Sequence, residues 1–176
     1  MKSGVSKTFT AAAGALLAGV IVLGAGMTAS AQSEQSPNGL EGTWRVQVVQ
    51  YNCANPAITF PPFYSLLSFH RGGTETETTS NPSLIPGQRT SGQGFWQSLG
   101  DGEYLMVVEA FILFDSPTTP PGLKTGTQKI VQAVVVTDEN HFASDGTVNF
   151  FAVDGSNYRS GCAKSFGSRL TAANQP

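Results

Sequence analysis

The sequence predicts an all-β fold in which antiparallel strands form a sandwich or a barrel. Eight stretches of strand-like composition follow one another between residues 43 and 170, at spacings of about 8 to 15 residues, and many are joined by short turns. After the first 31 residues, no window keeps a helical period of apolar side chains. Two cysteines stand near the two ends of this stretch, where a bond between them would hold the first and last strands together.

Turn residues and alternation define the individual strands. Arg71-Gly72-Gly73 forms a tight turn, and the run 74–79 after it alternates so that threonines lie on one face and carboxylates on the other. Proline-rich stretches at 55–62, 81–91 and 115–126 are expected to be loops. The eight expected strands are 43–52, 63–70, 74–79, 92–98, 103–115, 127–137, 141–153 and 157–170.

The first 31 residues have the three parts of an export signal. Lys2 and Lys7 form a positive region, residues 11–26 form an uncharged apolar stretch, and Ala29-Ser30-Ala31 matches a cleavage pattern. An uncleaved membrane anchor is the alternative, but the stretch of about 16 residues is shorter than the roughly 20 that a spanning helix needs. We therefore expect a signal peptide at 1–31, a flexible lead-in at 32–41, a single domain at 42–171 and a polar tail at 172–176, in a secreted or periplasmic protein.

Composition narrows the partners of the exported chain. Without the leader, eight basic residues stand against twelve acidic ones. Nucleic acid and anionic membrane surfaces are therefore unfavourable partners for this mildly acidic protein. No segment after the leader is long and apolar enough for stable membrane insertion.

The cysteines Cys53 and Cys162 both fall in the exported part of the chain. An even pair in an oxidising compartment most simply forms a disulfide, and this one would close a long loop between the end of the first strand and the last strand. A metal-thiolate pair or two free thiols are the alternatives. Neither cysteine has a cluster of histidines or carboxylates near it in the sequence, which favours the disulfide.

The triplet Gly42-Thr43-Trp44 opens the first expected strand. This Gly-x-Trp resembles the signature of the lipocalin and wider calycin barrels. In that group the glycine lets the chain turn into the barrel, the tryptophan plugs one end, and an arginine near the last strand packs over it; here Arg169 or Arg159 would do so. With the disulfide, the resemblance favours a closed, calycin-like, eight-stranded barrel, whose interior is either filled by side chains or holds one small ligand.

Common catalytic signatures are absent from the sequence. It contains no HExxH, G-x-S-x-G, Walker or CxxC motif, so no metal or other cofactor is expected. His70 stands at the end of a strand beside a glycine turn, where it could act as a general base. A solvent-exposed turn histidine is the alternative interpretation.

Glu109 is the strongest single candidate for a site residue. Alternation places it on one face with Leu105, Val107, Phe111 and Leu113, in a very apolar setting. Burial would raise the pKa of its carboxyl group and make it an acid, a base or an anchor for a polar ligand group. The alternative is a structural partner of a buried arginine.

Aromatic side chains are the third candidate feature. Tyr64, Tyr104, Trp96 and Phe111 could line an apolar pocket, with the tyrosine hydroxyls as hydrogen-bonding tips. Packing in an ordinary core is the alternative for the aromatic set as a whole.

The leading functional hypothesis is a secreted or periplasmic barrel that binds a small, mainly apolar molecule in its cavity. One rival is a cofactor-free cyclase or isomerase in which a buried carboxylate moves a proton. Another is an interaction protein, such as a protease inhibitor that uses the lead-in or the proline-rich loops. A partner subunit is a further possibility, because the strand at 103–115 is apolar on both faces.

Overall fold

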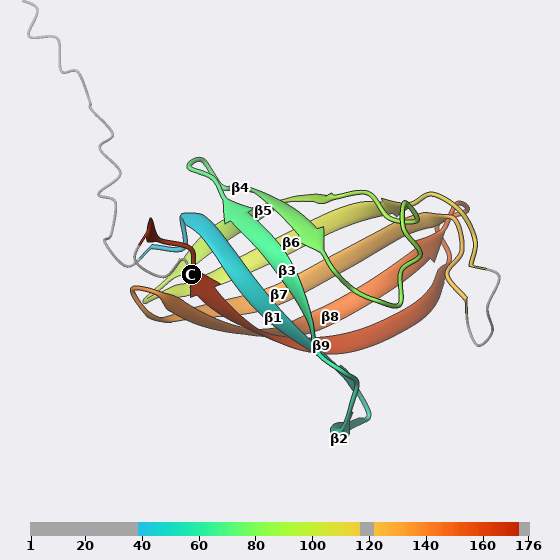
Figure 1. The fold of residues 1–176 in the computed structure, drawn as a ribbon, viewed down its shortest axis with the longest axis horizontal. Coiled ribbons are helices and arrows are strands. Elements are labelled where there is room, and N and C mark those ends of the chain that lie inside the picture. The colour runs from blue at the N-terminus through green and yellow to red at the C-terminus, as the bar shows by residue number, and fades with distance from the viewer. Residues whose placement is uncertain (1–38, 117–121, 173–176) are drawn as a thin grey trace, which may run out of the picture. The chain divides into compact units, whose positions relative to one another are not determined.

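The computed structural model describes residues 39–116 and 122–172, which form nine β-strands (Figure 1). The expected signal peptide, most of the expected lead-in and residues 173–176 lie outside the described part of the chain. The strands are β1 (Gly42–Asn52), β2 (Asn55–Thr59), β3 (Phe63–Phe69), β4 (Thr74–Thr79), β5 (Gly92–Gly100), β6 (Glu103–Ile112), β7 (Gly126–Asp138), β8 (His141–Ala152) and β9 (Asn157–Arg169).

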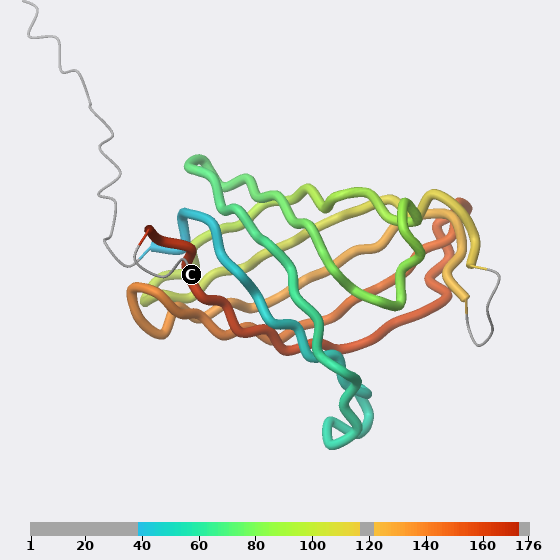
Figure 2. The backbone as a smooth tube through the Cα atoms, viewed as in Figure 1, coloured from blue at the N-terminus to red at the C-terminus, as the bar shows by residue number. Residues whose placement is uncertain are grey.

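Eight of the strands close into an antiparallel barrel. They pair in the order β1-β3-β4-β5-β6-β7-β8-β9, and β9 pairs back with β1 from Trp44–Arg169 to Tyr51–Cys162. Figure 2 traces the same backbone around the barrel wall. The predicted all-β, eight-stranded barrel is therefore confirmed. Among residues 39–116 and 122–172, no helix has the length and hydrophobicity needed to cross a membrane.

A short hairpin and a disulfide stand outside this simple meander. β2, which the sequence predicts as a proline-rich loop, pairs only with the end of β1, and all five of its residues are exposed. The β1–β2 hairpin projects away from the barrel wall (Figure 1). Cys53, in the turn directly after β1, is bonded to Cys162 of β9, and the two Cα atoms are 5.3 Å apart. The predicted disulfide is thus present, at the base of the projecting hairpin.

One end of the barrel is closed by a plug of Leu40, Trp44, Phe69, Phe142 and Arg169, which we call the Trp44 plug. Leu40 and Trp44 are fully buried, and the indole Nε1 donates to the Leu40 carbonyl oxygen at 2.9 Å. The Arg169 guanidinium lies 4.1 Å from the centroid of the Trp44 ring and donates to the carbonyl oxygens of Gly39 and Glu41. Residues 39–41, at the end of the expected lead-in, are therefore bonded to Trp44 and Arg169 of the barrel.

The opposite end is covered by the two loops that follow β4 and β6. Gln88 is fully buried and donates from its side-chain amide to the Phe114 carbonyl oxygen and to the Ser116 hydroxyl, at 3.1 and 2.8 Å. Leu123 packs with Ile112 of β6 in a second apolar cluster at this end. Gln88 thus ties the described parts of the two loops together, and Leu123 packs the second of them onto the barrel.

Candidate functional site

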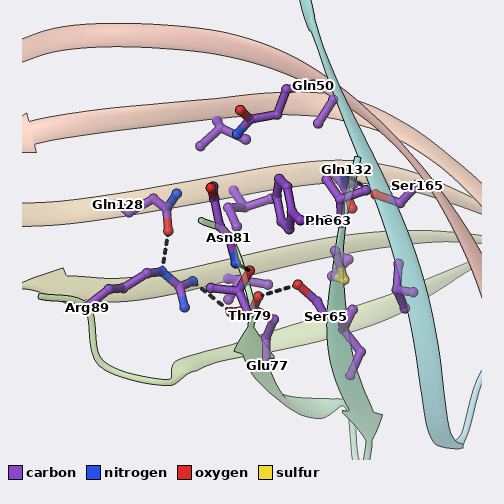
Figure 3. A pocket seen from close by; sticks show the side chains of 18 of the residues that line it. Gln50, Phe63, Ser65, Glu77, Thr79, Asn81, Arg89, Gln128, Gln132 and Ser165 are labelled. Carbon is purple, nitrogen blue, oxygen red and sulfur yellow. Dashed lines mark hydrogen bonds and ion pairs between the residues drawn. The ribbon is translucent and has the colours of Figure 1, made fainter. Parts of the chain in front are cut away.

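A cavity of about 50 Å³ lies inside the barrel and is lined by members of both apolar clusters. Apolar and polar side chains both line it, and Figure 3 shows the polar side chains that point into it. The apolar lining includes Val46, Leu67, Met106, Val108, Val148 and Ala163, and the polar lining includes Ser65, Glu77, Arg89, Gln128, Gln132 and Ser165.

A buried ion pair dominates the polar lining. Arg89, from the loop between β4 and β5, places Nη2 at 2.7 Å from Glu77 Oε2, and the two side chains are 4% and 6% exposed. The other Glu77 oxygen accepts the Ser65 hydroxyl at 2.9 Å, and Arg89 Nε donates to Gln128 Oε1 at 2.5 Å (Figure 3). The guanidinium is thus held between β4 and β7.

The alternation of β4 explains why two carboxylates enter the barrel. Side chains two residues apart on a strand share a face, and here that face is the interior, so Glu75 and Glu77 are buried and the threonines between and beside them face outward. β5 supplies the room. A Cβ at Gly94 would lie 2.7 Å from Glu75 Oε1, and one at Gly92 would lie 3.0 Å from Glu77 Oε2.

Glu75, unlike Glu77, has neither an ion pair nor a hydrogen bond to offset its burial among the described residues. It is 1% exposed, and neither carboxyl oxygen has a hydrogen-bond partner among the described residues. Burial, and to a smaller extent the neighbouring Glu77, raise the pKa of Glu75, while Arg89 lowers it, and together they bring it to about 8. At neutral pH this group is therefore a buried carboxylic acid, able to donate its proton. We refer to Ser65, Glu75, Glu77, Arg89 and Gln128 as the interior polar cluster.

A second polar chain crosses the opposite wall of the cavity. Gln132 of β7 donates from Nε2 to the Ser165 hydroxyl on β9 and accepts from the Ser144 hydroxyl on β8, both at 3.2 Å. All three side chains are buried. The cavity is therefore flanked by hydrogen-bonding groups on two sides, while its remaining walls are apolar.

Only a thin wall separates the cavity from a hollow on the outside of the loop between β4 and β5. That hollow has a volume of about 350 Å³. Thr79, Asn81, Leu84 and Arg89 line both spaces. A movement of this loop, to which Arg89 belongs, would join the two spaces.

The structure contradicts the expected burial of Glu109. Its side chain is 56% exposed on the outer face of β6 and lies 3.3 Å from Lys129 Nζ, which is also well exposed. The inward face of β6 is instead formed by Tyr104, Met106 and Val108, together with Ala110 and Ile112. Because Glu109 is in contact with solvent, the physical reason for assigning it an acid or base role is gone, and the isomerase hypothesis loses its residue.

The other predicted site residues do not come together either. His70 is exposed in the turn after β3, Tyr64 and Phe111 are 51% and 64% exposed on the outer surface, and none of the three lines the cavity. Trp96 and Tyr104 do point inward, with ring centroids 5.6 Å apart, but they pack against the Trp44 plug. The aromatic pocket expected from these residues is therefore wrong.

Sequence reasoning missed the residues that the structure does bring together. The alternation in 74–79 places Glu75 and Glu77 on one face, but an alternating strand of threonine and glutamate does not show which face is interior. The glycines at 92 and 94, both on the inward face of the adjacent strand, are the signal that could have indicated large side chains opposite them. Among the described residues, no group of histidine, cysteine and acidic side chains could hold a metal ion.

Comparison with known proteins adds no identity to this geometry. No protein-family model matches the chain, and no curated protein is similar enough to match it. The antiparallel eight-stranded barrel is compatible with a calycin-like fold, and the function has to be argued from the barrel interior itself.

Proposed function

We propose that this protein is a binding barrel that holds a compact amphipathic molecule in its interior cavity. The observation that carries the proposal is the mixed lining of the cavity, in which apolar walls are combined with the polar side chains of Ser65, Glu77, Arg89 and Gln128. Ligand pockets commonly combine apolar walls with a few placed polar groups in this way. The polar lining changes the expected ligand from a mainly apolar molecule to an amphipathic one.

The volume of the cavity limits the size of the bound group. A water molecule needs about 10 to 15 Å³ of such space, so a cavity of about 50 Å³ takes about three to five waters or a group of a few non-hydrogen atoms. A larger ligand would place only its head group here. Its remainder would then leave through the thin wall at Asn81, Leu84 and Arg89.

The energetics of the interior also favour a binding role. A buried ion pair is often no more stabilising than well-packed apolar residues of similar volume, because both charges lose their hydration. The 4% and 6% exposed side chains of Arg89 and Glu77, with the unpaired Glu75 beside them, are therefore not needed to fill a barrel. Their presence supports a site that uses hydrogen bonds and charge.

The place of action that we propose is outside the cytoplasm. The export-type residues 1–31 and the disulfide between Cys53 and Cys162 both suit a secreted or periplasmic protein, since such bonds persist in oxidising compartments. In that location a binding barrel meets small molecules that enter the cell envelope or leave the cell.

Filling the cavity tests the binding role. Ala163 lines the cavity and is 1% exposed, so Ala163→Val and Ala163→Leu should fill it in two steps. Thermal-shift and NMR titrations with compact neutral, cationic and anionic probes should show binding to the wild type. That binding should be weaker in Ala163→Val and weakest in Ala163→Leu. Ala133→Leu, on the exposed face of β7, is the matched control and should bind as the wild type does. A wild type that binds none of the three probe classes would contradict the proposal.

A further inference from the structure

We propose that the cavity selects a small organic cation, such as an alkylammonium group, whose positive charge is met by Glu75 and Glu77. This inference rests on the proposed binding role and adds the charge of the ligand to it. It stands on the number and the pairing of the charged groups inside the barrel.

The charged groups of the interior do not balance. Two carboxyl groups, Glu75 and Glu77, share a single guanidinium, that of Arg89, and Glu77 holds that guanidinium at 2.7 Å. Arg169 lies at the plugged end, where it donates to the carbonyl oxygens of Gly39 and Glu41 and stacks on Trp44. With both carboxyl groups ionised, the interior polar cluster would therefore lack one positive charge.

Glu75 is the group that shows this deficit. Both of its oxygens are buried without a hydrogen-bond partner among the described residues, which is costly for a polar group unless something else satisfies it. It lies two residues before the cavity-lining Glu77 on the same inward face of β4. A positive charge at Glu77 would therefore act on Glu75 as well.

Among the residues that the structure describes, the remaining neighbours of Glu75 offer no other counter-charge. The paired residues on β3 and β5 are Phe69 and Gly94, and the inward face of β6 carries Tyr104 as its one titratable side chain. In the empty barrel a proton on Glu75 supplies the missing charge, which is consistent with a pKa of about 8. A bound cation would replace that proton, whereas an anion would meet two carboxyl groups and a neutral ligand would leave the deficit unchanged.

Exchange of a proton for a cation predicts a specific pH dependence. Below about pH 8, binding must release the Glu75 proton, so affinity should rise by up to about tenfold per pH unit and level off above that value. The ligand itself should not titrate in this range. Tetramethylammonium, a compact and permanently charged ion, meets that requirement and is the probe we choose.

The test is isothermal titration calorimetry of the whole exported chain with tetramethylammonium at about pH 6 and about pH 7. We expect affinity to rise about tenfold between them, and two buffers with different ionisation enthalpies should report the release of close to one proton. In Glu75→Gln the rise and the proton release should both disappear. Glu109→Gln, which removes an exposed carboxylate, should keep both.

Two further probes, tert-butanol, which is neutral, and acetate, which is an anion, distinguish failure of the cation proposal from failure of the binding proposal. If tert-butanol or acetate binds and tetramethylammonium does not, the cation proposal is overturned while the binding barrel stands. If none of the three probes binds, the cation proposal and the binding proposal both fail. Binding of tetramethylammonium without pH dependence, or with the same dependence in Glu75→Gln, would also overturn the assignment to Glu75. Should that variant fail to fold, the wild-type proton release alone decides, because binding without it excludes the exchange.

Discussion

The two halves of the barrel interior are built on different principles. At the plugged end, Leu40 and Trp44 are fully buried, the indole donor has its acceptor, and Arg169 closes the ring face toward solvent. In the middle, Glu77 and Arg89 line a cavity, and the adjacent Glu75 has no hydrogen-bond partner among the described residues. The first region is closed by packing and by hydrogen bonds and stabilises the fold, whereas the second keeps unsatisfied polarity at the expense of stability. That difference supports the proposal that the second region is the binding site.

The plug should show the largest loss of stability on mutation. Trp44→Ala removes a fully buried indole and leaves a cavity, so it should lower the free energy of unfolding by about 4 to 5 kcal/mol. Urea denaturation followed by circular dichroism measures this change. Phe111→Ala is the control, because that side chain is 64% exposed and its removal should cost about 1 kcal/mol or less. Equal effects of the two substitutions would show that the plug is not the stabilising end.

Breaking the interior ion pair should have the next largest effect. Arg89→Met leaves Glu77 buried beside Glu75 without a positive charge, which should cost about 2 to 4 kcal/mol. The loss is limited because a buried carboxyl group can take up a proton in place of its partner. Arg71→Met provides the comparison, since that side chain is 70% exposed and its contact with Glu41 is 3.8 Å long. If Arg89→Met left the free energy of unfolding unchanged, the interior polar cluster would have to be hydrated and open to solvent.

Glu75→Gln should act in the opposite direction and stabilise the protein. Because the pKa of Glu75 is raised to about 8 in the folded state, the folded protein holds a proton that the unfolded chain releases above about pH 4.5. Wild-type stability therefore falls as pH rises from about 4.5 to about 8. The variant lacks this loss and should be more stable at about pH 8, by on the order of 2 kcal/mol. Thermal melts across this range that coincide for the two proteins would contradict the burial of a proton.

The smallest effect is expected on the outer surface. Glu109→Gln breaks a pair with Lys129 in which the two side chains are 56% and 42% exposed, so the free energy of unfolding should change by less than about 1 kcal/mol. The change should shrink further at high salt, because exposed charges are screened. A large loss of unfolding free energy that does not depend on salt would contradict the exposure of Glu109 and indicate that its carboxylate is buried.

The wall of the barrel was predictable from the sequence because turns and alternation are local signals. Tight turns such as Gly72-Gly73, whose φ angles are +93° and +86°, and the alternating runs between them placed the eight strands close to their observed positions. β2 was not predictable in this way, since its pairing depends on how β1 continues past the edge of the barrel. Prolines in its neighbourhood instead indicated a loop.

The site was less predictable because the direction of a strand face is decided by closure of the whole sheet. β6 is apolar on both faces, so alternation alone could not tell that Met106 and Val108 point inward and that Glu109 points outward. In β4 the same ambiguity concealed Glu75 and Glu77. Their partner Arg89 lies in a loop, where no periodicity indicates which way a side chain points.

The most direct test of this account is the protonation state of Glu75. ¹³C NMR of the side-chain carboxyl carbons, assigned through the loss of one signal in Glu75→Gln, follows each glutamate through a pH titration. The account predicts that the Glu75 signal titrates with a pKa of about 8 and remains that of a protonated acid at neutral pH. A Glu75 signal that titrates near the ordinary value of about 4.5 would show that the carboxyl group is hydrated or paired, and the unbalanced interior would not exist.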